Sequence, residues 1–181
     1  PETAPLVNGV LAPLFAAYEA AKIAREARAP LDLDLPEHKI VLNEAGEVES
    51  IRPRERLEAH RLIEEFMILA NVAAAETLER RRTPLIYRVH DTPDREKLLS
   101  LKDFLETIGL KLSLGQVMEP RVFNRILSLA RNTGNEELVN TVVLRSQSQA
   151  VYSPENIGHF GLNLGKYAHF TSPIRRYADL V

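Results

Sequence analysis

The sequence predicts a mainly helical fold of the α+β class, with one long central helix and a small β-hairpin or meander. Over residues 55–82, two rows of apolar side chains recur at helical spacing, one through Phe66 and one through Met67. These rows predict a helix that is enclosed on more than one side. Residues 39–51 carry two short apolar runs around a turn at 44–46, which is the pattern of a hairpin. No repeat or low-complexity stretch occurs, so one domain is expected.

The other elements follow in order along the chain. Residues 5–28 predict an alanine-rich helix, and leucine then alternates with aspartate from residue 30 up to the hairpin. Pro84 ends the long helix, residues 85–89 predict a strand, and helices are expected over 92–108, 120–130 and 135–148. Glycines and aromatic residues over 149–170 indicate close-packed turns and strand, and a last helix is predicted from Pro173.

The composition limits the classes of function. The 181 residues include no cysteine, which excludes disulfides and thiolate metal sites and is typical of a reducing cytoplasm. No apolar run approaches the roughly 20 residues of a membrane span, and nothing implies an oligomer. The net charge of −2 weakly disfavours a free-standing nucleic-acid-binding module. Because the chain ends within the first turns of the last predicted helix, we expect it to be part of a longer protein.

The most informative stretch is residues 169–179. Arg175 and Arg176 follow Ser172, a good N-cap, so they lie at the positive end of the predicted helix. A cation there costs about 0.3–1 kcal/mol, whereas a bound phosphate would reverse the sign. The alternative is that Arg175 pairs with Asp179 one turn later, and local physics leaves both interpretations open.

Glu64 and Glu65 form a second candidate constellation in the middle of the long helix. Their side chains point about 100° apart. Glu65 lies one turn from Arg61 and is interpreted as half of a surface ion pair. Glu64 lies two turns from Asn71, so an acid and an amide share a face that could bind a ribose hydroxyl or a base edge. The default interpretation is a satisfied core network, because buried polar groups are usually hydrogen-bonded.

Other polar and aromatic residues give weaker signals. The five histidines show no metal-ligand spacing, and Asp32 and Asp34 are interpreted as a solvated strand edge, so no metal site is expected in this chain. Several aromatic side chains could stack on bases, although core packing is the stronger interpretation, above all for Phe160 and Phe170. That aromatic set comprises Tyr152, Phe160, Tyr167, Phe170 and Tyr177.

Four motifs in this order resemble the catalytic RNB domain of the bacterial ribonuclease II and ribonuclease R family. They are IEEFMILAN at residues 63–71, LRS at 144–146, GHFGL at 158–162 and YAHFTSPIRRY at 167–177. The resemblance covers nearly the whole chain, from about Leu6 to Val181, and is closest to the ribonuclease R-like proteins. The last motif is the most specific.

The resemblance implies the C-terminal part of a 3′-to-5′ exoribonuclease domain that hydrolyses single-stranded RNA to 5′-mononucleotides. It implies Arg175 at the scissile phosphate, and Glu64, with Glu65 as a less certain neighbour, at the terminal nucleotides. Asn71, Arg176 and Tyr177 are the further predicted RNA contacts. Leu33 stands where family members often carry a phenylalanine that stacks on the terminal base, so one side of the base clamp is expected to be weakened in this chain.

Two parts of the family pattern have no counterpart in these 181 residues. The aspartate motif that binds Mg²⁺ lies upstream in the family, and the flanking RNA-binding barrels of the OB type, cold-shock and S1, are missing. We therefore expect a magnesium-dependent parent enzyme and an inactive isolated fragment. The alternatives are a non-catalytic RNA-binding or scaffold domain that keeps the fold, and an unrelated helical interaction domain.

Overall fold

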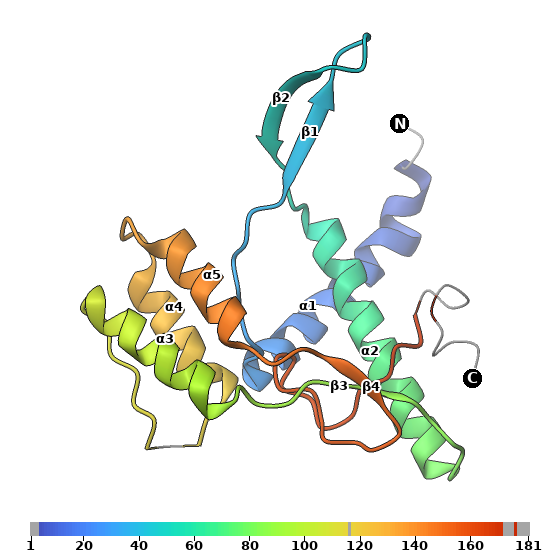
Figure 1. Ribbon diagram of the computed structural model, residues 1–181. Coiled ribbons are helices and arrows are strands. Elements are labelled where there is room, and N and C mark those ends of the chain that lie inside the picture. The colour runs from blue at the N-terminus through green and yellow to red at the C-terminus, as the bar shows by residue number, and fades with distance from the viewer. Residues whose placement is uncertain (1–3, 116, 172–175, 177–181) are drawn as a thin grey trace.

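The structure, a computed structural model, describes residues 4–115, 117–171 and 176, and it confirms the mainly helical α+β fold (Figure 1). A 3₁₀ turn (Ala4–Leu6) and a π-helical turn (Val7–Leu11) lead into helix α1 (Ala12–Arg28). The hairpin consists of β1 (His38–Leu42) and β2 (Val48–Pro53), and the long helix is α2 (Glu58–Arg80). The helix predicted from Pro173 lies outside the described residues.

The second half of the chain joins a small sheet to three helices. Strand β3 (Tyr87–Val89) pairs antiparallel with β4 (Val151–Ser153). Between them in sequence lie α3 (Arg95–Thr107), α4 (Pro120–Ala130) and α5 (Glu136–Ser146). Asp94 caps α3 by accepting from the backbone N–H of Lys97 at 2.8 Å, and Gly109 follows that helix with a φ of 77°. Helix α4 has the predicted bounds, and the ends of β3, α3 and α5 lie within three residues of those expected. Strand β4 falls in the predicted turn-and-strand segment over 149–170.

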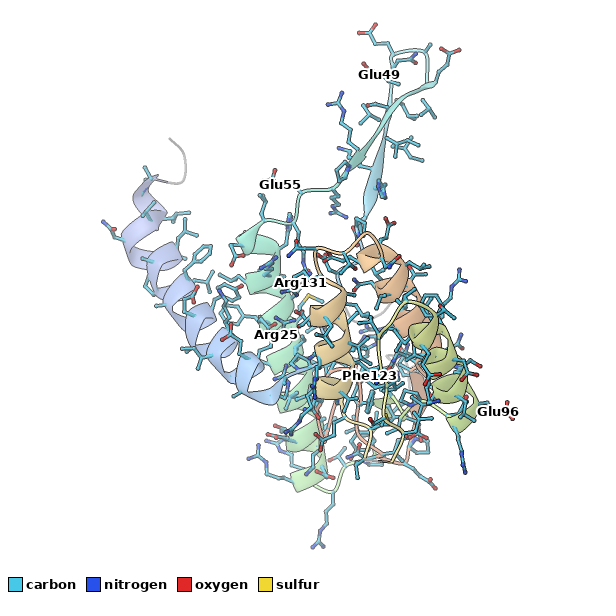
Figure 2. All side chains as sticks on the ribbon, turned by 90° about the vertical axis from the view of Figure 1, so that its left-hand side faces the viewer. Arg25, Glu49, Glu55, Glu96, Phe123 and Arg131 are labelled. Carbon is cyan, nitrogen blue, oxygen red and sulfur yellow. The ribbon has the colours of Figure 1, made fainter. Side chains whose placement is uncertain are left out.

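The main hydrophobic core lies among α3, α4 and α5, where periodic apolar residues meet. Phe123 is fully buried at its centre, as Figure 2 shows, with Leu101 and Leu105 from α3 and Val139 and Val143 from α5. Burying one such side chain stabilises the fold by about 1.5–3 kcal/mol. The extended chain after α1 adds side chains to the edge of this core, so the core also fixes a segment that belongs to no helix or strand.

Helix α2 is continuous, and it is buried on different faces in its two halves. Leu62 and Glu65 are buried in the first half, where α1 packs on α2, and Asn71 and Ala75 are buried in the second half. The expectation that the rows through Phe66 and Met67 would both be buried is wrong, because Phe66 is half-buried and Met67 is exposed. The covering elements approach from two sides that the apolar pattern does not mark.

The β1–β2 hairpin projects from the body of the molecule (Figure 1). Ile40 lies opposite Ile51 and Leu42 opposite Val48, and all four side chains are exposed. Asn43 closes the turn, since its Oδ1 accepts from the backbone N–H groups of residues 45 and 47 at 3.0 and 2.9 Å. The bonds of this turn are local.

Residues 4–28 form one helical stretch that is long and apolar enough, by length and composition alone, to cross a membrane. No such segment was expected from the sequence. One such helix is weak evidence for a membrane span, because core helices of soluble proteins and signal sequences share these properties. In this fold the stretch packs on α2, where the Tyr18 hydroxyl donates to Glu58 at 3.0 Å.

Candidate functional site

A cavity of about 470 Å³ lies between residues 33–37 and the start of α2, and we call it the α2 cavity. Its lining is charged as well as apolar: it includes Leu33, Asp34, Arg54, Arg56, His60 and Glu64. Two residues singled out from the sequence, Leu33 and Glu64, therefore meet in one cavity although they are far apart in the chain. Leu33 is half-buried, since its side chain also packs against the helical core.

Glu64 presents a half-exposed carboxylate to the α2 cavity. It forms an ion pair with Arg56, and this hydrogen bond raises the pKa of the Arg56 guanidinium. Such an exposed pair contributes little to stability, about 0–1 kcal/mol. A ligand hydroxyl can therefore compete for the carboxylate at small cost. Glu64 shares a helix face with Asn71, as predicted, but its half of that face is open.

Glu65 is buried, so its interpretation as half of a surface pair with Arg61 is wrong. Its carboxylate forms an ion pair with the Nε of Arg25 at 3.1 Å. Arg61 instead forms an ion pair with Glu58 at 3.2 Å. Figure 2 shows Arg25 on the side of α1 that faces α2. The side of α2 that carries Glu65 is the side on which α1 packs. Glu65 therefore joins the two helices.

Asn71 is 1% exposed and fixes the backbone of residues 167–171, which we call the anchored segment. Its Oδ1 accepts from the backbone N–H groups of Phe170 and Thr171, both at 2.9 Å. Its Nδ2 donates to the Tyr167 hydroxyl at 2.8 Å. Asn71 therefore fits the default interpretation of a satisfied core network, whereas Glu64, which that interpretation included, is half-exposed and takes no part in it. Its partners lie almost a hundred residues away, so the spacing along α2 could not identify them.

Arg176 extends this arrangement. Its guanidinium donates to the carbonyl oxygen of His169 at 3.0 Å and to that of Thr171, so it binds back to the anchored segment. Arg175 and Tyr177, the other two predicted residues of this motif, lie outside the described residues. The anchored segment thus leads directly into the predicted arginine motif.

Two neutral histidines hold the loop that precedes the anchored segment. His90 accepts from the backbone N–H of Gly161 on Nδ1 at 2.9 Å, and its Nε2 lies 2.8 Å from the carbonyl oxygen of Ser148, as a donor. Burial lowers the pKa of His90, and burial with the neighbouring His90 lowers the pKa of His159 to about 4. A Cβ on Gly161 would lie 2.9 Å from the His90 ring, so glycine is required there. The sequence analysis assigned no role to either histidine.

The aromatic residues divide between core and surface. Phe160 packs edge-on against Phe123 in the core, as expected, with ring centres 6.0 Å apart. Phe170 was also expected in the core, but it is 60% exposed. Its backbone is held by Asn71, so the ring stands at the surface of the anchored segment. Tyr152 carries the guanidinium of Arg88 over its ring at 4.7 Å.

The described residues do not fit a magnesium ion. Over residues 4–115, 117–171 and 176, no group of three or more His, Asp or Glu side chains is arranged to hold a metal. Asp32 pairs with Arg25 at 3.3 Å, and Asp34 lies in the wall of the α2 cavity. Neither carboxylate is part of a ligand cluster.

The chain is similar to known proteins in sequence and in fold. Residues 4–181 match the RNB domain family. The chain is 44% identical over 177 residues to ribonuclease R of Escherichia coli strain K12, covering 98% of this chain and 22% of that protein. Mycoplasma genitalium RNase R, solved in complex with ribose-methylated single-stranded RNA, superposes with a TM-score of 0.84 at 30% identity, over 95% of this chain and 27% of that one. Yeast Ssd1, a pseudonuclease, shares the fold alone, with 22% identity and a TM-score of 0.57 over 70% of this chain and 16% of that one. The chain therefore spans about a fifth of the length of the curated relative.

Proposed function

This chain belongs to the RNB domain family, and from that membership we propose that it is part of a 3′-to-5′ exoribonuclease that hydrolyses single-stranded RNA to 5′-mononucleotides. The observation that carries the proposal is the meeting of Leu33 and Glu64 in the α2 cavity. The family resemblance assigns both positions to the terminal nucleotides. A site for an RNA end needs an apolar surface for a base and an acceptor for a ribose hydroxyl, and this cavity offers both.

In this proposal the site residues have two kinds of role. Arg175 stabilises the charge that develops on the scissile phosphate, where an oriented guanidinium is most effective. Glu64 contacts the ribose at the RNA end, and Tyr177 contacts RNA beside the arginine. Glu65, Asn71 and Arg176 act as positioning residues, because Glu65 pairs with Arg25, and Asn71 and Arg176 bond to the backbone of the anchored segment.

The proposal places the magnesium ligands outside the described residues, which do not fit the ion. Bound there, magnesium would supply the positive charge that lowers the pKa of a water and offsets charge on a leaving oxygen. We propose that the 181 residues alone do not release nucleotides, and that the protein works in the cytoplasm, which its lack of cysteine favours.

The test uses the full-length gene product and the 181-residue polypeptide side by side, each with 5′-labelled single-stranded RNA and Mg²⁺. We expect stepwise shortening from the 3′ end and release of 5′-mononucleotides by the full-length product only. Magnesium-dependent digestion by the 181 residues alone would mean that the metal ligands have been misplaced.

The second candidate is a non-catalytic RNA-binding or scaffold domain. The observation that favours it is the fold likeness to yeast Ssd1, a pseudonuclease, because the same fold can occur without catalytic activity. A full-length product that binds single-stranded RNA but leaves it intact at every Mg²⁺ concentration would support this candidate and reject the first.

A further inference from the structure

One wall of the α2 cavity is formed by a segment, residues 30–37, that is outside every helix and strand. Figure 1 shows it as a coil that runs from the end of α1 past α5 to β1. A chain in this state has no sheet partner for its backbone N–H and C=O groups, so its position depends on other bonds.

Asn124, on α4, supplies two of those bonds. Its Nδ2 donates to the carbonyl oxygen of Pro30 at 2.8 Å, and its Oδ1 accepts from the backbone N–H of Asp32 at 2.9 Å. One amide therefore pairs with a carbonyl and an N–H two residues apart, as the N–H and C=O of one residue in a parallel strand would. Because the amide binds the segment at two points, it fixes both the position and the direction of residues 30–32 relative to α4.

Asn140, on α5, supplies the next bond along the same edge. Its Oδ1 accepts from the backbone N–H of Asp34 at 2.9 Å, and its Nδ2 donates to the Glu136 carbonyl within its own helix at 3.0 Å. Asn140 is 3% exposed, so water does not compete for this bond. Alternate residues of an extended chain present their N–H groups to one edge, which is why both amides reach the segment.

Leu33 lies between the two bonded N–H groups. Its side chain packs against the core of α3, α4 and α5 and also lines the α2 cavity with Glu64. Backbone bonds hold the two ends of the segment, from the Leu31 N–H to the Gly161 carbonyl at 2.8 Å and from the Arg54 N–H to the Glu37 carbonyl at 2.7 Å. Between these ends the two asparagines hold the cavity wall, without lining the cavity themselves.

We infer that Asn124 and Asn140 are positioning residues that hold Leu33 in the cavity wall and thereby set how tightly the α2 cavity binds the terminal nucleotide of RNA. This inference rests on the proposed function, since it takes the cavity as the site of the RNA 3′ end. Neither residue belongs to a motif that suggested the family.

The test measures kcat and KM of the full-length gene product for a short oligoribonucleotide. Asn124→Leu and Asn140→Leu keep the number of side-chain heavy atoms and the branching at Cγ and remove the bonds, so KM should rise about tenfold in each, as expected for the loss of one or two hydrogen bonds. The value of kcat should change less than about threefold, because the reacting phosphate is not touched.

Aspartate variants separate positioning from general stability. Asn140→Asp keeps the accepting oxygen for the Asp34 N–H, loses the bond within α5 and adds a buried carboxylate. It should therefore lower the free energy of unfolding, while its KM stays near that of the unchanged protein. Asn124→Asp loses the donor to Pro30, so its KM should rise. This pair also carries the test if a leucine variant does not fold.

The matched control is Asn156→Ala. Asn156 likewise bonds two backbone groups, at Gly158 and Gly165, both at 2.9 Å, but it lines a different cavity. Its KM should not change. Equal KM values in both aspartate variants, or the same rise in the control, would overturn the positioning role alone. An unchanged full-length protein that leaves RNA intact would instead overturn the proposed function, and this inference with it.

Discussion

The α2 cavity and the anchored segment use the same face of α2 in two different ways. Glu64 and Asn71, seven residues apart, project within about 20° of each other on an α-helix. At Glu64 the face is open, and the carboxylate is half-exposed in an exchangeable ion pair. At Asn71 the face is closed by residues 167–171, and every polar group of the amide is bonded to protein.

This difference indicates a division of labour along one rigid helix. An open, weakly paired carboxylate is suited to contact a ligand, whereas a buried amide with three partners is suited to hold a segment in place. We expect changes at the cavity to affect RNA binding, and changes at or beyond the anchored segment to affect stability and turnover. Four predictions test this division, from the largest effect to the smallest.

The largest effect is expected for Arg175, which follows the anchored segment. Arg175→Ala in the full-length protein should lower turnover by about two to three orders of magnitude, by analogy with the loss of one oxyanion donor. RNA affinity should fall much less, and Arg175→Lys should restore little, because lysine lacks the planar fork. Single-turnover kinetics with a short oligoribonucleotide separates the two quantities. Unchanged chemistry with weakened binding would make Arg175 a phosphate anchor only.

The next effect concerns the anchor. Asn71→Leu should lower the free energy of unfolding by about 2–4 kcal/mol, because it leaves two part-buried backbone N–H groups and the buried Tyr167 hydroxyl without their partner. Tyr167→Phe should cost only about 1 kcal/mol, since it removes one bond. Urea unfolding measures both. Equal losses in the two variants would show that the backbone bonds to Asn71 contribute nothing.

A smaller effect is expected from the buried histidines. Because His159 has a pKa of about 4 in the fold and about 6.5 when unfolded, the unfolded state binds more protons between these values. The contribution of His159 to the free energy of unfolding is therefore fully present above about pH 6.5. It is lost as the pH falls towards 4, by about 1–2 kcal/mol once the partial exposure of the ring is discounted. Unfolding measured from pH 7.5 to 4 should show this slope. His159→Gln should reduce the slope, and His38→Gln on the exposed hairpin should leave it unchanged.

The smallest effect is expected in the cavity. Glu64→Gln should raise KM for RNA by a factor of about 3–10, the value of one ordinary hydrogen bond, because glutamine keeps an accepting oxygen but loses the charge; unfolding should change little. Steady-state kinetics and urea unfolding of the same variant give both numbers. A large loss of stability at Glu64 would contradict the division, because it would make this carboxylate structural like Glu65.

The sequence predicted the elements well because their signals are local. The long helix, the hairpin and three of the later helices follow from side-chain periodicity and from proline or glycine at their ends. The burial of particular side chains was harder to predict. Glu65 was predicted on the surface, but Arg25 of α1 packs against it. Phe170 was predicted in the core, but its backbone is held by Asn71, about a hundred residues away in the chain, and its ring is exposed.

The candidate site shows the same limit. Arg175 and Glu64 could be named from the family motifs, and Asn71 was named with them as an RNA contact. No local pattern showed that Asn71 bonds residues 167–171, or that Asn124 and Asn140 hold the cavity wall. A side-chain amide in a helix has no spacing signal when its partner is a distant backbone group, so only the folded chain identifies such positioning residues.

The projecting hairpin offers a practical handle for labelling. Its turn is closed by local bonds from Asn43, and Glu44 is exposed at its tip. Because none of the 181 residues is a cysteine, Glu44→Cys would create a single thiol in this chain for a fluorescent dye. A dye at this position stands away from the core, so it should report the arrival of RNA through its anisotropy without disturbing the fold.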